Sequence, residues 1–476
     1  MTGPELSSPL VLEVGLALLM LLIFVVGLFM TGEDKRRVGV LTAIGLVVLF
    51  GFSWRTEAGT TELFHGTFVQ DELALFAKRL FLLATLIGVL ASLPLRAAAF
   101  ARRATEYYLA ILASLLGMLV LASARDLVLL FVAFELMSIP LYYLAGFLKR
   151  EPEAVEAALK FFLIGTVSSA VLAYGLSFMY GVAGTTDVRG VARALETNHP
   201  MMLLGMLLAL GGLGFKIAAF PFHMWVPDTY EAASTPFVAW LSVAPKAAGF
   251  VVIFRLYLDG MGDRVVYWVP AAAALATVTI IGGNLMAIPQ QNVKRLLAYS
   301  GVAHIGYMLV GFAAVSANGT AMMLFYLVAY LFGNMGAFLV VEAVAQAEGS
   351  DAIAAFRGLA QRSPILALCM LLFLLSLGGI PFVAGFWAKL YVFWAAAEQG
   401  LYWLVLVGAV LTVVALFYYL LVAKRMYIDT PERREPIPVA PLLQFCIFLC
   451  VLGVVVMGIY PKPLVVAALR AVGPLF

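Results

Sequence analysis

Charged residues are scarce in this sequence, and their scarcity decides the broad class of the protein. Asp, Glu, Lys and Arg make up only 12% of the 476 residues, whereas hydrophobic residues make up 64%. Soluble globular domains carry roughly 25% charged residues. Because the apolar residues extend over the whole length, the sequence predicts one transmembrane domain over residues 1–476, without a separate soluble domain.

The sequence also lacks the motifs of several kinds of chemistry. Its three cysteines, Cys369, Cys446 and Cys450, lie in apolar stretches without CxxC spacing, which indicates buried thiols rather than disulfides or a metal site. There is no GxxxxGK[ST] loop, no dinucleotide-binding fingerprint after a strand and no HExxH motif. We therefore expect no catalytic residue, no bound metal and no nucleic-acid partner for this chain.

Long apolar stretches dominate what is present. A membrane-spanning helix needs about 20 mostly apolar residues. On that basis the sequence predicts an all-α polytopic protein of about fourteen spans, the first being a span rather than a cleaved signal peptide. They lie near 9–31, 38–54, 73–93, 106–122, 126–148, 157–181, 200–220, 236–257, 267–288, 299–316, 320–345, 364–395, 400–426 and 441–460.

Basic residues are concentrated in alternate loops, which predicts the orientation. The richer loops lie around residues 35–37, 96–103, 149–160, 294–295, 357–362 and 424–434. Loops rich in Lys and Arg face the cytoplasm. With an even number of spans, both termini are expected on the outer side. The loop after Trp225 is the exception on the cytoplasmic side, because it carries Asp228 and Glu231 instead of basic residues.

Two stretches combine a glycine cluster, a Pro-Phe break and a lysine inside apolar sequence. The first, Leu203–Asp228, contains Lys216 shortly before Pro221, and the second, Ser376–Lys389, contains Gly378-Gly379-Ile380-Pro381 before its lysine. They occupy the seventh and twelfth predicted spans. An offset of five spans reverses the direction of the chain, so we expect two inverted five-helix repeats, near 106–257 and 267–426. Broken helices at matching positions of inverted repeats are typical of transporters.

Four ionisable residues lie well inside predicted spans: Glu135, Lys216, Lys246 and Lys389. A charge at the centre of a membrane helix costs about 2.5–3.5 kcal/mol, so four unpaired ones would cost on the order of 10 kcal/mol. One alternative is that their side chains extend to the membrane surface from helix ends. Otherwise they face the interior of the bundle, where they find partners or water.

A glutamate and three lysines have the chemistry needed to move protons. Burial lowers the pKa of a lysine, whereas a nearby carboxylate raises it again. A lysine can therefore be switched between its charged and neutral forms by its partner, whereas an arginine stays protonated. We expect Glu135 and Lys216 to form such a pair, with Lys246 and Lys389 as further stations.

Two histidines lie close to this set. His304, in AYSGVAHIGYML, falls within the tenth predicted span. It is either a proton relay between Lys246 and Lys389 or a hydrogen-bonded structural residue. His223 follows the break at Pro221, and both a structural role and a role in proton entry remain open for it.

The motifs around these residues resemble one known family. They are FELMSIPLYYLAGF, GFKIAAFPFHMWVPDTYEAASTPFVAWLSVAPKAAGF, QQNVKRLLAYSGVAHIGYML and RSPILALCMLLFLLSLGGIPFVAGFWAKLYVF. Together they are similar to the antiporter-like membrane subunits of respiratory complex I, above all subunit N of bacterial NADH-quinone oxidoreductase, the counterpart of mitochondrial subunit 2. The wider family includes subunits of multi-subunit cation/proton antiporters and membrane-bound hydrogenases, which remain the alternative.

This resemblance implies a proton-translocating subunit in the bacterial plasma membrane. In the family the proton path follows a glutamate of the fifth span, lysines of the seventh and eighth and a charged residue of the twelfth, which correspond to Glu135, Lys216, Lys246 and Lys389. The resemblance implies other membrane subunits of the complex as partners, with protons, water and lipid around the chain. Flavin, iron–sulfur clusters and quinone are expected in other subunits, and no cofactor is expected in this one.

Overall fold

The computed structural model describes residues 9–56, 59–95, 100, 102–194, 199–259 and 268–476. Contacts between residues divide the chain into two compact units, each described here by itself. Unit 1 comprises Met1–Ile217, Ala244–Trp268 and Arg470–Phe476, and unit 2 comprises Ala218–Val243 and Val269–Leu469. The chain thus leaves unit 1 after Ile217, the residue that follows Lys216, and returns at Ala244, two residues before Lys246. The two inverted repeats stay a prediction, since the units have other boundaries.

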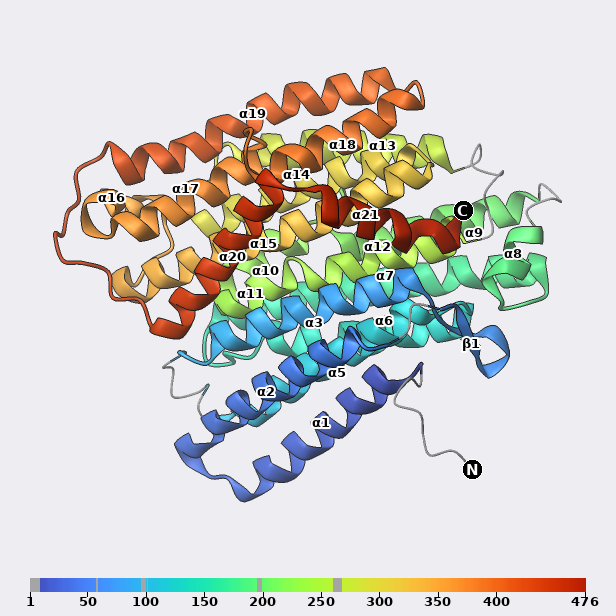
Figure 1. Cartoon of the computed structure of the whole chain (residues 1–476), viewed down its shortest axis with the longest axis horizontal. Helices are drawn as coiled ribbons and strands as arrows, with labels where there is room; N and C mark the ends of the chain where they lie inside the picture. The colour runs from blue at the N-terminus through green and yellow to red at the C-terminus, as the bar shows by residue number, and fades with distance from the viewer. Residues whose placement is uncertain (1–8, 57–58, 96–99, 101, 195–198, 260–267) are drawn as a thin grey trace. The chain divides into compact units, whose positions relative to one another are not determined.

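Unit 1 consists mainly of membrane-length helices, with two shorter helices and one short β-hairpin (Figure 1). In the hairpin Thr61 pairs with Gln70 and Leu63 with Phe68, antiparallel. The elements of unit 1 are α1 (Val11–Phe29), α2 (Arg36–Ser53), β1 (Thr61–Leu63), β2 (Phe68–Gln70), α3 (Glu72–Ser92), α5 (Ala104–Ser123), α6 (Leu127–Ala145), α7 (Pro152–Ala183), α8 (Val188–Ala194), α9 (Pro200–Ile217) and α12 (Ala244–Tyr257).

Unit 2 is also helical throughout its described residues, and several of its helices are short pieces. Its elements are α10 (Trp225–Ala232), α11 (Thr235–Leu241), α13 (Val269–Ala287), α14 (Val293–Ala313), α15 (Ala317–Glu348), α16 (Leu359–Arg362), α17 (Pro364–Gly378), α18 (Ala384–Glu398), α19 (Tyr402–Tyr427) and α20 (Pro441–Ile459). The last helix, α21 (Lys462–Val472), passes from unit 2 into unit 1.

Polar side chains and glycines define where these helices begin and end. Asp71 begins α3 by accepting a hydrogen bond from the backbone N–H of Ala74 at 2.8 Å, and Asn292 begins α14 in the same way through Arg295. Gly184 and Gly349 end α7 and α15 in the left-handed conformation. Local sequence chemistry therefore defines these four helix ends.

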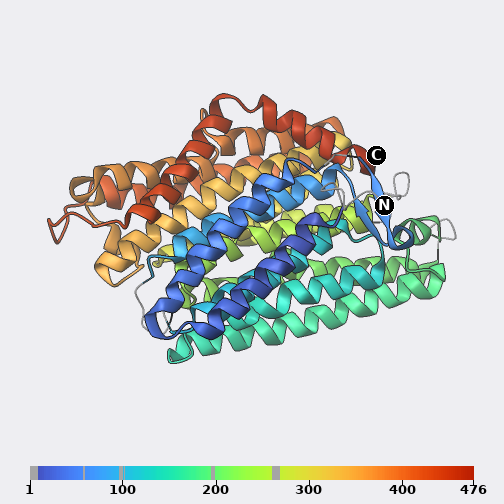
Figure 2. The same cartoon turned by 60° about the horizontal axis from the view of Figure 1, so that its bottom comes forward.

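Small residues let helices of unit 1 approach closely. A Cβ atom added to Gly175 of α7 would lie 2.7 Å from the backbone N of Ala209 in α9. Lipid tails are as apolar as leucine side chains, so membrane helices associate through such close packing rather than through the hydrophobic effect. The neighbours α1, α2 and α5 lie side by side in both views of the chain (Figures 1 and 2).

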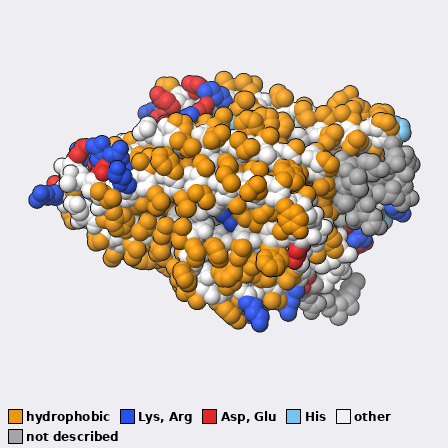
Figure 3. Space-filling view, turned by 90° about the horizontal axis from the view of Figure 1, so that it is seen from above, with side chains coloured by type: hydrophobic (Ala, Val, Ile, Leu, Met, Phe, Trp, Pro, Cys, Tyr) orange, Lys and Arg blue, Asp and Glu red, His pale blue; other side chains and the backbone are white. Residues whose placement is uncertain are grey.

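The predicted membrane architecture is confirmed. Among the described residues, thirteen helices are long and apolar enough to cross a membrane, and they match thirteen of the fourteen predicted spans. The remaining one, 364–395, is divided between α17 and α18 at the predicted Gly-Gly-Ile-Pro break. Apolar side chains cover most of the face seen in Figure 3, while charged ones gather toward its edges. The chain is a multi-pass membrane protein.

Several predicted boundaries differ from the observed helices by a few residues, and two of the differences lie beside buried lysines. The seventh span ends at Ile217 rather than 220, because Ala218 adopts φ +63°, which no α-helix accommodates. The eighth predicted span, 236–257, is confirmed as a span over Thr235–Tyr257, but its helix is interrupted at Ser242–Val243, between α11 and α12. Its proline, Pro245, lies in the first turn of α12, where a proline is tolerated, so its position marks a helix start.

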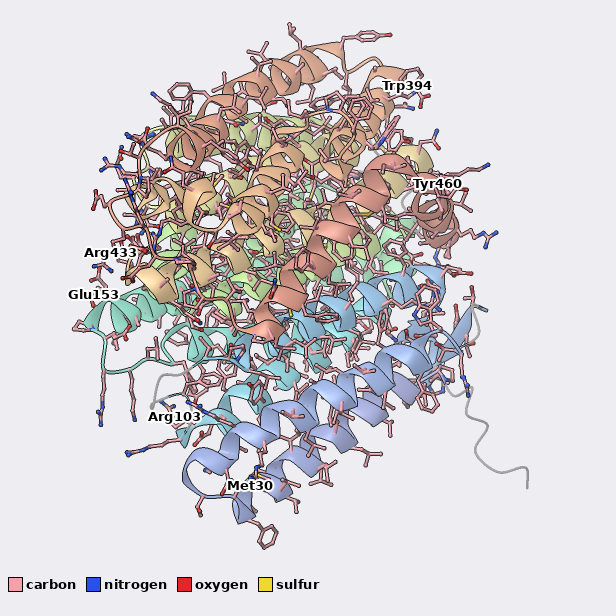
Figure 4. All side chains as sticks on the ribbon, turned by 60° about the vertical axis from the view of Figure 1, so that its left-hand side comes forward. Met30, Arg103, Glu153, Trp394, Arg433 and Tyr460 are labelled. Atoms are coloured by element: carbon pink, nitrogen blue, oxygen red, sulfur yellow. The ribbon has the colours of Figure 1, made fainter. Side chains whose placement is uncertain are left out.

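Within each unit, the labelled residues lie at the helix ends that the alternation of the loops predicts. In unit 1, Arg103 and Glu153 lie at the same end of the helices (Figure 4). In unit 2, Arg433 lies at one end and Trp394 and Tyr460 at the other. Which of these ends faces the cytoplasm stays a prediction, and residues 96–99, in one of the basic loops, lie outside the described part.

Candidate proton-translocation site

Lys216 lies in the last turn of α9 and is 2% exposed, so its ammonium group is inside the protein. Its Nζ donates a hydrogen bond to Oγ of Ser138 in α6 at 2.9 Å. Ser138 in turn donates to the carbonyl of Phe134 at 2.6 Å, and the ring of Phe134 faces the ammonium at 5.6 Å. A hydroxyl and an aromatic face therefore hold this cation.

Glu135 lies one helical turn before Ser138, so both side chains project from the same face of α6. The carboxylate interacts electrostatically with Lys216. Its Oε1 is buried and makes no hydrogen bond within the described residues. The structure thus brings together the predicted pair, with Ser138 as the direct hydrogen-bond partner of the lysine and Glu135 as its nearby opposite charge.

Lys246 lies in the first turn of α12 and is 1% exposed. The helix α12 packs against α9 at Gly249, one turn beyond Lys246. A Cβ atom added to Gly249 would lie 2.7 Å from Cγ2 of Ile217 and 3.6 Å from Cγ of Lys216. The glycine lets the two helices approach, and unit 1 therefore holds Glu135, Lys216 and Lys246 in one region.

Lys389 is in α18 of unit 2 and is 4% exposed. Its Nζ donates to the carbonyls of Leu377 at 3.0 Å and Gly378 at 3.4 Å, at the C-terminal end of α17. The aromatic ring of Tyr307 faces the ammonium at 4.7 Å. The C-terminus of a helix carries a partial negative charge, so the broken helix itself stabilises this cation.

Gly379 explains how α17 can present its carbonyls to the lysine. It adopts φ +80°, and an added Cβ atom would lie 3.0 Å from Cδ of Lys389. Only glycine combines the left-handed conformation with this close approach. The glycine cluster noted in the sequence therefore shapes the lysine site directly.

His304 lies in α14 of unit 2, buried among hydroxyl groups. Its Nδ1 is hydrogen-bonded to the hydroxyl of Tyr326 at 2.8 Å, and its Nε2 to the hydroxyl of Tyr419 at 3.2 Å. Tyr419 also bonds to Oγ of Ser300. The histidine is thus part of a hydrogen-bonded network, which agrees with both roles considered for it.

The same network extends toward Lys389. The ring of Tyr418 lies beside that of Tyr419, with centroids 4.6 Å apart, and its hydroxyl donates to Oδ1 of Asn284 at 3.0 Å. Nδ2 of Asn284 donates to the hydroxyl of Tyr307 at 3.1 Å, and the ring of Tyr307 is the one that faces Lys389. Unit 2 therefore places His304 and Lys389 at the two ends of one polar cluster.

The other residues singled out by the sequence lie elsewhere. His223 is buried and stacks on Phe220 with ring centroids 5.0 Å apart. Asp228 and Glu231 both bind Nη1 of Arg295, at 2.9 and 2.7 Å. The unusual acidic loop after Trp225 is therefore matched by a basic residue of α14 within unit 2.

Sequence reasoning missed Ser138, Asn284 and the tyrosines. A hydroxyl or amide in an apolar helix costs far less than a charge, so these residues did not stand out. The nearest signal was their spacing: Ser138 follows Glu135 by one turn, and Tyr307 follows His304 by one turn. Within the described residues, no group of three or more His, Cys, Asp or Glu side chains is placed to hold a metal ion, and the three cysteines are free.

Interrupted membrane helices that hold buried lysines define a class of proteins, those that carry ions across membranes. The sequence matches the family described as NADH:quinone oxidoreductase/Mrp antiporter, transmembrane, over residues 124–415. NADH-quinone oxidoreductase subunit N of Heliobacterium modesticaldum is 41% identical over 474 residues, covering 98% of this chain and 99% of the relative.

Solved structures agree with this match. A chain of respiratory complex I from Thermus thermophilus is 31% identical and superimposes with a TM-score of 0.81, covering 95% of this chain and 98% of that one. A chain of the Mrp complex from Dietzia sp. shares the fold at a TM-score of 0.85 and 20% identity, covering 98% and 97%. The chain belongs to the NADH-quinone oxidoreductase subunit N family, and the resemblance stated from its motifs is confirmed.

Proposed function

We propose that this chain is the membrane subunit of a bacterial NADH-quinone oxidoreductase that moves protons through Glu135, Lys216, Lys246, His304 and Lys389. The observation that carries the proposal is Lys216, a buried ammonium at the end of an interrupted helix beside a hydroxyl and a carboxylate. A charge buried in a membrane helix is costly, which makes it a candidate for function rather than for packing.

The geometry of unit 1 supports a switch. While Glu135 is ionised, it stabilises the ammonium form of Lys216. When Glu135 takes up a proton, the ammonium loses its opposite charge and Nζ releases its proton, because burial favours the neutral amine. Lys246, on the helix that packs against α9 at Gly249, is the next basic group of the proposed path in unit 1 and accepts that proton on its own Nζ. Glu135 gains one proton, Lys216 loses one and Lys246 gains one.

In unit 2 the same proposal assigns different tasks to its residues. Helix-end carbonyls hold the charged form of Lys389 in place. The hydroxyl groups around His304 keep its ring oriented and hydrogen-bonded, which a relay between donor and acceptor requires. His304 and Lys389 would receive protons and pass them toward the opposite side of the membrane.

The redox reaction would occur elsewhere in the complex. We place flavin, iron–sulfur clusters and the quinone site in other subunits, and this chain in the plasma membrane with both termini on the outer side. The matched family also includes Mrp antiporters. Purification of the chain with its native partners distinguishes the two complexes. NADH-oxidising subunits accompany it in a NADH-quinone oxidoreductase, and no redox subunit accompanies it in an antiporter.

Replacement of Lys216 tests the proposal. In inner-membrane vesicles, K216A is expected to lower NADH-driven proton pumping about tenfold or more, because the switched group is absent. The K216A chain should still co-purify with the NADH-oxidising subunits, which shows that the complex assembles. Lys424→Ala, at an exposed position of α19, is the matched control and should pump normally. Undiminished pumping by assembled K216A would refute the proposal.

A further inference from the structure

A second cluster of buried charges lies in unit 1, and the proposed proton path does not use it. It consists of Asp71 before α3, Arg125 between α5 and α6, Arg255 in α12 and Asp259 after α12. The side chains are 0–3% exposed. Both arginines and both aspartates are therefore removed from water, which is costly unless each charge is matched.

Each charged side chain of this cluster is paired with at least one group of opposite charge. Nη1 and Nη2 of Arg255 each donate to an oxygen of Asp71 at 2.7 Å, in the paired geometry that makes this contact strong. Nε and Nη2 of Arg255 also donate to the carbonyl of Ala122, at 3.2 and 3.0 Å. Arg125 donates from Nε to Asp259 at 2.9 Å and from Nη1 to Glu62 at 2.8 Å.

The cluster lies at one end of unit 1, beyond the lysines. Arg255 follows Lys246 by nine residues on α12, a rise of about 13 Å at 1.5 Å per residue. Glu135 lies eight residues after the start of α6, about 12 Å from that end. The hairpin that carries Glu62 and the helix α8 lie at this end of the unit (Figures 1 and 2), and the side chain of Glu62 is 48% exposed.

The two arginines and Asp71 cannot pass a proton onward. A guanidinium has only donors and stays protonated, so it can neither accept a proton nor release one. Burial opposes the ionisation of Asp71, but Arg255 outweighs it, and the pKa of this carboxyl lies below its ordinary value. Both oxygens of Asp71 are already occupied by Arg255, and Oδ1 also accepts from Ala74. A chain of hydrogen bonds that carries protons is thus interrupted here.

We propose that Asp71, Arg125, Arg255 and Asp259 form a proton-tight seal at this end of unit 1, so that Lys216 and Lys246 exchange protons with one side of the membrane only. Fixed arginines serve as barriers to protons in other membrane pores. The proposal rests on the proposed function, because a seal matters only beside groups that exchange protons. A cluster that merely joins the ends of α3, α5 and α12 is the competing explanation.

Passive proton leakage distinguishes the two explanations. The purified, assembled complex is reconstituted in liposomes containing a pH-sensitive dye, and a potassium diffusion potential set with valinomycin drives protons without NADH. The variant D71N/R255Q removes both charges but keeps an amide pair, and the asparagine that replaces Asp71 can still cap α3. We expect its proton influx to rise at least about tenfold, because water can fill the space left by the shorter side chain.

The control variant separates the seal from general damage. R425Q/D429N makes the same change at an Arg–Asp pair in unit 2, joined at 2.6 Å and more exposed, and it should be as tight as the unaltered complex. An assembled D71N/R255Q complex without extra leakage would overturn the seal, as would equal leakage in R425Q/D429N.

A third variant covers the case in which D71N/R255Q does not assemble. Arg125→Gln leaves Asp259 bound to Arg189 at 3.2 Å and Glu62 half exposed, so its cost to assembly is smaller. We expect a leakage increase of about threefold, and an assembled, tight R125Q complex would then overturn the seal. Because the leak is measured without turnover, its outcome is independent of whether K216A abolishes pumping.

Discussion

The lysine sites of the two units are built differently, although both lie at interrupted helices. Lys216 in unit 1 has a serine hydroxyl as hydrogen-bond partner and the carboxylate of Glu135 nearby. Lys389 in unit 2 donates to two carbonyls at the end of α17. Each ammonium also faces an aromatic ring, Phe134 in one case and Tyr307 in the other.

The difference lies in what can change. A carboxylate can take up a proton and so withdraw its support from a lysine, whereas backbone carbonyls keep their partial charges whatever the pH or the state of the enzyme. Lys216 is therefore suited to being switched, and Lys389 to holding a proton at a fixed place. Substitutions that act on one site but not on the other test this distinction.

The largest loss of pumping is expected from replacing Lys389, the lysine held by backbone carbonyls. Lys389→Met leaves the two carbonyls of α17 without their donor and removes the ionisable group of this lysine site. NADH-driven pumping by the assembled complex should fall about tenfold or more. Lys424→Met, which changes an exposed lysine of α19 in the same way, should have no effect. Normal pumping by K389M would remove Lys389 from the path.

Glu135→Gln should lower the pumping rate less, and it changes only the lysine site of unit 1. It keeps the shape of the side chain but removes the charge that supports the ammonium of Lys216. Without a switchable partner, the pumping rate should fall about fivefold while the complex stays assembled. Glu153→Gln, at an exposed position of α7, is the control. If E135Q pumps like the control, Ser138 alone suffices and the distinction between the two sites fails.

Gly379→Ala should have the smallest effect, and one confined to unit 2. The left-handed conformation of residue 379 costs about 1–2 kcal/mol for alanine, and the new methyl group would press on Lys389. We expect a lower unfolding temperature of the purified complex and a loss of pumping of about two- to threefold. Gly333→Ala, whose added methyl group would meet its nearest atom at 3.7 Å, is the matched control. Equal stability of the two variants would contradict the assigned role of Gly379.

The sequence was sufficient to predict the membrane helices and the buried lysines Lys216, Lys246 and Lys389, for one physical reason. Long apolar stretches and charges within them have large free energies, so few alternatives compete with the structure they indicate. The break before Lys389 was predicted as well, because Gly379 and Pro381 together exclude a continuous helix.

Weaker or distant interactions could not be predicted in this way. Ser138 contributes one hydroxyl to an apolar helix, and nothing in the sequence connects it to a lysine 78 positions away. Asp71 and Arg255 are 184 positions apart, and nothing in the sequence connects one to the other. The division of the eighth span was missed because Pro245 is also acceptable within the first turn of a helix.

The central claim is that Lys216 releases its proton during turnover, rather than serving as a permanent positive charge. The most direct measurement is the initial rate of NADH-driven proton pumping by an assembled complex that carries Lys216→Arg. An arginine keeps the charge and can donate to Ser138, but it does not release a proton. The proposed switch predicts a loss of pumping as complete as that of K216A. Pumping by K216R at the rate of the unaltered complex would contradict it.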